Sequence, residues 1–65
     1  MAKHRIAVGD RFCRPTTPRH VFVVAALVDH PGRPPHARLR AEGGPDELLV
    51  GTYALTDPEV WRRVD

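Results

Sequence analysis

The sequence has few of the residues on which reactive sites depend. Its 65 residues include a single cysteine, Cys13, and no serine. One cysteine excludes an intrachain disulfide and a metal site made of several thiolates, and it agrees with a reducing compartment. Nucleophilic catalysis would need Cys13 or a threonine beside a base, and no motif in the sequence places such a base.

Long apolar runs and aromatic side chains are also scarce. The longest apolar run, Val21 to Val28, has eight residues, which is too short to span a bilayer. The N-terminal stretch MAKHRIAVGD holds no apolar segment of signal-peptide length. With only four aromatic residues, the core must consist mainly of Val, Leu, Ala and Ile. We therefore expect one small soluble domain over residues 1–65, located in the cytoplasm and without a membrane partner.

Charge is distributed unevenly along the chain. Residues 1–40 carry eight Lys and Arg against two acids, a net charge of +6, and they hold all four histidines. Residues 41–65 carry two arginines against six acids, a net charge of −4. Such asymmetry is typical of an anion-binding face, but an arginine-rich, high-GC genome produces the same pattern. Both interpretations stay open from the sequence.

Two segments carry clear strand patterns. VFVVAALVD, Val21 to Asp29, is rich in β-branched residues, and apolar side chains occupy both of its alternating faces. That pattern predicts a strand that is buried on both sides or covered by a partner. After the proline-rich turn HPGRPP, the segment HARLRAE places Ala37 and Leu39 on one face and basic residues on the other. This alternation predicts a half-buried strand with a basic outer face.

Shorter elements are expected on either side. At the start we expect a strand over residues 6–12 with a kink at Gly9, followed by a loop, CRPTTPRH. After the turn GGPD, the segment ELLVGTY predicts a strand with Leu48 and Val50 inward. A single 3₁₀ turn near residues 53–55, one more turn capped by Asp57, and a closing strand over 61–64 complete the chain.

These elements predict an all-β fold, a small, partly open barrel of four or five strands with a short 3₁₀ turn near the C-terminus. The side chains expected in its core are Ile6, Val8, Val21, Val23, Leu27, Leu39, Leu48, Val50, Leu55 and Trp61.

The order of these elements resembles the SH3-like small barrels. VGDRF, the hairpin over residues 21–42, ELLVGTYAL and VWRRV match the first strand, the meander and the last strand of that fold. The resemblance implies a fold and no particular function. VGDRF, PPHARLR and TDPEVWRRV also resemble short bacterial proteins of high-GC genomes, for which we know of no activity.

A remote alternative is the type II dihydrofolate reductases, SH3-like barrels that form a tetramer around a central pore. VGDRF is similar to their first strand. Their Val-Gln-Ile-Tyr segment, however, falls where this chain reads LLVGTY, so only Tyr53 corresponds. The residues that build the pore are missing, and we predict that the chain is not an enzyme.

Metal binding has weak support in the sequence. The histidines His4, His20, His30 and His36 show no spacing typical of metal ligands, although His30 and His36 flank the same turn. We predict no metal, no cofactor and no small-molecule substrate.

A basic row on the strand after the proline-rich turn is the candidate anion-binding or nucleic-acid-binding site. Its members are Arg33, His36, Arg38 and Arg40. Alternation places Arg38 and Arg40 on one face about 6.6 Å apart along the strand, close to the spacing of phosphates on a nucleic-acid strand. Arg11 and Arg14 would extend the row if the first strand lay alongside.

The favoured function is a small non-enzymatic interaction module that binds a protein, in an adaptor, regulatory or phage-type role. The apolar strand over residues 21–28 would then bury one face in a homodimer or in a larger partner. Nucleic-acid binding through the basic row is the alternative.

Overall fold

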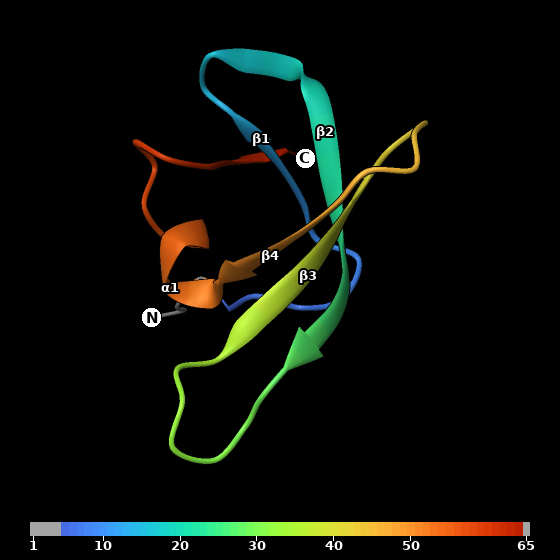
Figure 1. Cartoon of the computed structure of the whole chain (residues 1–65). Helices are drawn as coiled ribbons and strands as arrows, with labels where there is room; N and C mark the ends of the chain where they lie inside the picture. The colour runs from blue at the N-terminus through green and yellow to red at the C-terminus, as the bar shows by residue number, and fades with distance from the viewer. Residues whose placement is uncertain (1–4, 65) are drawn as a thin grey trace.

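Five antiparallel strands and one helical turn form the fold in the computed structural model, which describes residues 5–64 (Figure 1). The elements are β1 (Arg11–Arg14), β2 (Thr17–Val28), β3 (His36–Ala41), β4 (Glu47–Gly51), α1 (Thr52–Leu55) and β5 (Arg62–Val64). The strand order is β4-β3-β2-β1-β5, so β4 and β5 form the two edges of a single open sheet. The predicted all-β, partly open barrel is confirmed.

A β-bulge in β2 decides which of its side chains reach the core. Val24 lies opposite Leu39 on β3, and the register shifts between Val24 and Ala26, so that Leu27 lies opposite Ala37. Residues directly opposite each other share a face. The core side of β2 therefore changes from even to odd positions at the bulge. This explains why both alternating faces of the segment are apolar.

Part of the predicted core is wrong, and the bulge explains why for the residues of β2. Val21 and Val23 lie on the outer face and are half-buried instead of being core residues. Leu27 faces the core side but lies near the end of the strand, where it is 47% exposed. Val8 is 61% exposed, because residues 8 and 9 form a turn in which Gly9 takes a positive φ of 98°.

The first hairpin is tighter than the sequence suggested. The predicted loop CRPTTPRH is wrong: only Pro15 and Thr16 form a turn, and β2 already begins at Thr17. Pro18 is accommodated because the β1–β2 pairing is irregular next to it and residues 17–20 are exposed. The first strand begins at Arg11 instead of residue 6, after the kink predicted at Gly9.

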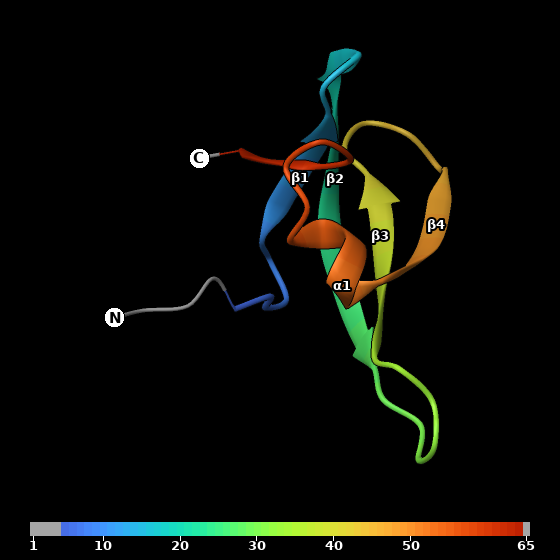
Figure 2. The same cartoon turned by 90° about the vertical axis from the view of Figure 1, so that its left-hand side faces the viewer.

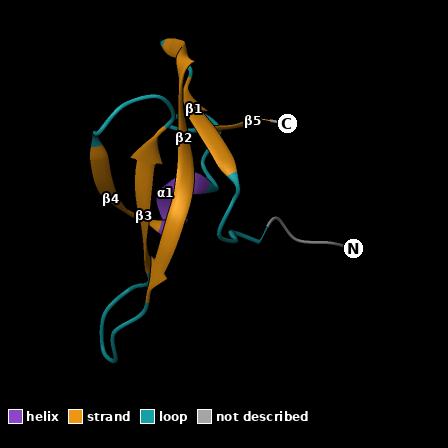
Figure 3. Ribbon diagram, turned by 90° about the vertical axis from the view of Figure 1, so that its right-hand side faces the viewer, coloured by secondary structure: helices purple, strands orange, loops and turns teal. Residues whose placement is uncertain are grey.

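Figures 2 and 3 show α1 against the concave face of the sheet, and the core includes side chains from α1 and from this face. Its buried apolar side chains are Phe12, Val24, Ala37, Leu39, Leu55 and Trp61. Of the predicted set, Leu39, Leu55 and Trp61 are buried, and Ile6, Leu48 and Val50 pack against them from the border. The Trp61 ring meets Phe22 edge to face, with 5.7 Å between ring centroids.

The predicted short helical turn is present as α1. It begins as an α-helical turn and ends in 3₁₀-type bonds, in which Thr56 N–H donates to Tyr53 O and Asp57 N–H to Ala54 O, both at 3.2 Å. Asp57 then caps the next turn, since its Oδ1 accepts the Glu59 N–H at 3.0 Å. The predicted closing strand follows as β5. Within residues 5–64, no helix is long and apolar enough to cross a membrane.

Candidate functional site

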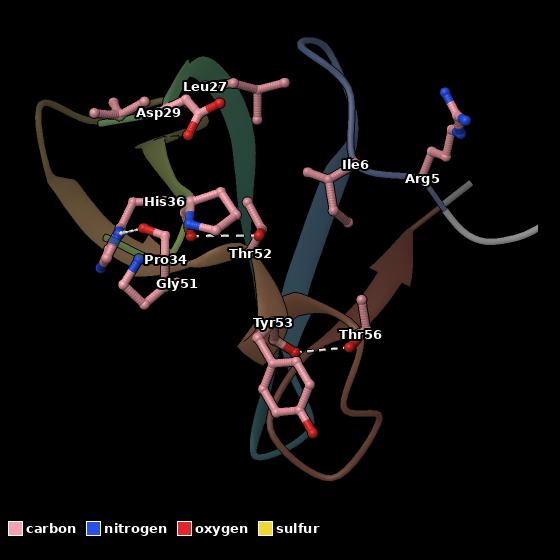
Figure 4. Close-up of a pocket in the computed structure, with 12 residues that line it drawn as sticks. Arg5, Ile6, Leu27, Asp29, Pro34, His36, Gly51, Thr52, Tyr53 and Thr56 are labelled. Carbon is pink, nitrogen blue, oxygen red and sulfur yellow. Dashed lines mark hydrogen bonds between the residues drawn. The ribbon is translucent and has the colours of Figure 1, made fainter. Parts of the chain in front are cut away.

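An open hollow of about 900 Å³ lies at the end of the barrel where the loop after β2 meets α1. The segment before β1, the end of β2, the proline-rich loop and the start of α1 all contribute to its lining (Figure 4). The apolar lining residues are Ile6, Leu27, Val28, Pro34, Pro35 and Tyr53. The charged or titratable ones are Arg5, Asp29 and His36.

Two exposed apolar side chains share this hollow. Leu27 is 47% exposed and Tyr53 is 87% exposed, and both line it. Figure 4 shows Ile6, from the segment before β1, between Arg5 and Asp29, which lie on opposite sides of the hollow. The result is an apolar floor between two charges of opposite sign.

Hydrogen bonds from neighbouring elements hold the proline-rich side of the hollow. The His36 Nδ1–H donates to Pro34 O at 2.8 Å, which orients the imidazole. Thr52 N–H donates to Pro35 O at 3.1 Å and ties the first residue of α1 to the loop. Proline has a fixed φ, so this wall of the hollow has little conformational freedom.

The four residues of the predicted basic row are only partly brought together. Arg38 and Arg40 do share the outer face of β3, where they lie opposite Leu49 and Glu47 of β4. His36 follows on the same face and also lines the hollow. Arg33 is exposed in the loop, away from the strand. Arg11 lies on the same outer face as Arg40, because both lie opposite Val23 of β2. The Arg14 guanidinium instead lies over the Trp61 ring, 4.8 Å from its centroid.

Acidic side chains neutralise much of this outer face. Arg11 forms a two-pronged ion pair with Glu42, with N···O distances of 2.7 and 3.1 Å. This bond lowers the pKa of the Glu42 carboxyl and raises the pKa of Arg11. Arg40 lies 3.7 Å from Glu47. Among residues 5–64, no acidic side chain forms an ion pair with Arg38 or with Arg33, so Arg38 is the arginine of β3 most available to an anion.

A second charged cluster fixes the opposite side of the barrel. Asp10 accepts the Ala7 N–H at 2.9 Å and pairs with Arg63 at 3.0 Å. The Ala7 hydrogen bond is the main cause, and Arg63 a further one, of the lowered pKa of Asp10. The Arg63 guanidinium also lies 5.0 Å from the Phe12 ring centroid. These contacts tie the segment before β1 to β5, and a smaller hollow of about 350 Å³ lies beside Phe12 and Arg63.

The residues weighed for metal binding are not brought together among residues 5–64, and Cys13, the one cysteine, lies inside the sheet. Cys13 is buried, and its neighbours across the sheet are Val21 and Arg62. No group of three His, Cys, Asp or Glu among residues 5–64 could hold a metal ion. His4, the remaining histidine of the prediction, lies outside the described residues.

Sequence reasoning did not find the hollow, because its lining comes from four separate segments. One local signal was available: apolar Leu27 and Val28 directly precede the proline-rich turn, whose last prolines lead into His36. Comparison with protein-family models, with curated proteins and with solved structures finds no match to this chain.

Proposed function

We propose that the chain is a small non-enzymatic binding module that holds an extended segment of a partner protein in the hollow beside α1. The observation that carries this proposal is the pair of exposed apolar side chains, with Leu27 on the floor of one stiff-walled hollow and Tyr53 at its rim. Small soluble domains seldom leave such groups together without a partner. Aromatic side chains at a concave surface are typical anchors of protein interfaces.

The shape of the hollow favours a protein segment over a small molecule. Sites for small molecules enclose most of the ligand, whereas this hollow is open to solvent along one side. The Tyr53 side chain extends away from the barrel instead of closing over the hollow (Figure 4). A peptide can lie across such a surface, with apolar side chains on the floor and its ends in water.

The charges beside the hollow define the partner further. Arg5 lies at one side and Asp29 at the other, with Ile6 between them (Figure 4). A matching segment carries apolar side chains in its centre, an acidic group near Arg5 and a basic group near Asp29. Such complementarity sets the direction of binding more than its strength.

A peptide library displayed on phage, followed by titration of the selected peptides, tests this proposal. We expect the selected sequences to have an apolar centre flanked by opposite charges. In spectra of the ¹⁵N-labelled protein, the amides of Val28, Thr52 and Tyr53 should shift on binding. Leu27→Asp should weaken binding about tenfold or more, because it puts a charge on the apolar floor.

Val60→Asp is the matched control, since Val60 is an exposed apolar residue that does not line the hollow. It should leave peptide affinity unchanged. If no peptide is selected, or if the shifts fall on the outer face of β3, the proposal is wrong. Shifts at Arg38 and Arg40 with nucleic acid instead of peptide would favour the alternative function.

A further inference from the structure

The edge strand β4 presents unpaired backbone groups. β4 is the last strand of the sheet, and Figure 2 shows no other described segment beyond it. The hydrogen bonds at its two ends fix which groups point outward. Ala41 N–H donates to Asp46 O, and Thr52 N–H donates to Pro35 O. Along an antiparallel strand, successive residues direct their backbone N–H and C=O groups alternately toward the partner strand and away from it. The backbone groups of the even-numbered residues of β4 therefore face β3.

The odd-numbered residues of β4 therefore direct their N–H and C=O groups away from the sheet. These residues are Glu47, Leu49 and Gly51. The side chain of Leu49 is 62% exposed on the outer face. An edge of this kind is a template for another strand unless charge, proline or a bulge blocks it. Between its first and last residues, β4 carries only leucine and valine.

We propose that β4 pairs with β4 of a second copy of this chain, in an antiparallel ladder centred on Leu49. With a two-fold axis at Leu49, each Leu49 exchanges two backbone hydrogen bonds with its counterpart. Each Glu47 does the same with Gly51 of the other copy. This register uses all three outward-facing residues, whereas a shift of two positions leaves one of them unpaired.

The side chains and charges fit the same register. The two Leu49 side chains lie against each other and bury apolar surface that one copy exposes. Glu47 lies opposite Gly51, which has no side chain, and His36 follows one strand further on the same face. The carboxylate therefore faces an imidazole and no like charge. The Arg38 side chains of the two copies are separated by both leucines, about 14 Å apart, where salt screens their repulsion.

The dimer would also bring an acidic group to the border of the hollow. Gly51 and His36 both line it, and Glu47 of the second copy would lie beside Gly51 on the outer face of the sheet. This arrangement goes beyond the proposed peptide binding and does not depend on it.

Sedimentation velocity from micromolar to millimolar concentration tests the dimer. We expect a concentration-dependent shift from monomer to dimer. Leu49→Pro should raise the dissociation constant about tenfold or more, because it removes both central N–H donors and no hydrogen bond to β3. Leu49→Lys should act likewise, since lysine is a common blocker of exposed edges. Val60→Asp is the control, because Val60 is exposed and lies neither in β4 nor in the hollow, and it should dimerise like the wild type.

Amide hydrogen exchange provides a second readout that does not rely on a variant. The amides of Leu49 and Gly51 should become protected only as the concentration rises, while those of Leu48 and Val50 are protected at every concentration. A protein that stays monomeric throughout the range overturns the proposal. A dimer that persists in folded Leu49→Lys overturns it as well, because the interface would then lie elsewhere.

Discussion

The two edges of the sheet are built in opposite ways. β5 has three residues, two of which are arginines, and Arg63 is held both by Asp10 and by the face of the Phe12 ring. Arg63 also donates to the Arg5 carbonyl at 3.3 Å, so the segment before β1 lies close by. β4 has five residues, an exposed leucine and no such charges in its middle.

This difference shows which edge of the sheet is blocked against further strand pairing and which edge is open to it. A short edge strand that carries charged side chains is a poor template for another strand. A longer edge strand with apolar residues in its middle is a better one. The hollow lies on the same open side, since Gly51 and Thr52 line it. The charged contacts that hold an edge in place are therefore found at β5, whereas the two proposed binding surfaces lie at β4 and the start of α1.

The strongest test of this contrast is truncation of one large side chain on each side. Trp61→Ala should cost about 3–5 kcal/mol of unfolding free energy, because Trp61 is buried against Phe22 and under Arg14. A loss of that size should leave a 65-residue domain largely unfolded. Leu49→Ala should change the unfolding free energy by no more than about 0.5 kcal/mol.

Urea unfolding followed by circular dichroism, at concentrations where the chain is monomeric, measures both values. Leu39→Ala, in the middle of β3, provides a reference from the core and should cost about 2–5 kcal/mol. If Leu49→Ala lowers the unfolding free energy of the monomer as much as Trp61→Ala does, both sides of the sheet contribute equally to stability. The proposed difference between the two edges is then wrong.

The sequence predicted best where pattern and turn chemistry agree. Regular alternation around Leu39, between a proline-rich loop and a Gly-Gly turn, predicted β3 and its inward face correctly. Asp57 followed by proline correctly indicated the turn before β5. Strand β3 and the turn at Asp57 are determined by residues close together in the sequence, and contacts with the rest of the fold do not change them.

The predictions from the sequence were wrong where the pattern of residues allowed more than one structure. In β2 both alternating faces are apolar, so nothing in the sequence locates the bulge that changes the inward face near Ala25. The two prolines near Thr17 suggested a long loop, because the irregular pairing that accommodates Pro18 is not visible in the sequence. The hollow and the open edge depend on strand order, which alternation alone does not reveal.

Lowering the pH gives a finer test of the β5 edge, where Asp10 pairs with Arg63. The pKa of Asp10 is lowered in the folded state, so its ionised form stabilises the fold. This contribution is complete above the unfolded-state pKa of about 3.9 and is lost as the pH falls through the lower folded-state value. Asp10→Asn should therefore destabilise the protein at neutral pH by at most about 0.5 kcal/mol, since solvent screens the pair.

The difference between Asp10→Asn and wild type should shrink when unfolding is measured below pH 4, about where the unfolded carboxylate becomes protonated. Glu59→Gln, in an exposed turn, controls for the loss of one negative charge. A difference that stays constant down to strongly acidic pH would show that the Asp10 charge contributes nothing to this side of the barrel.

The smallest expected effect concerns anion binding on the open side, where Arg38 lies next to Leu49. Because Arg40 is paired with Glu47 and Arg11 with Glu42, we expect only weak binding of single-stranded RNA at low salt. One or two phosphate contacts give a slope of log affinity against log salt between about −0.7 and −1.4. The Arg38→Ala, Arg40→Ala double variant should make this slope shallower by about 0.7, since Arg38 supplies most of the contact. Glu47→Gln is the informative partner variant, because it releases Arg40 and should steepen the slope. A wild-type slope of several units that the double variant abolishes would make nucleic-acid binding the principal function, and it would mean that the ion pairs on the outer face open when RNA binds.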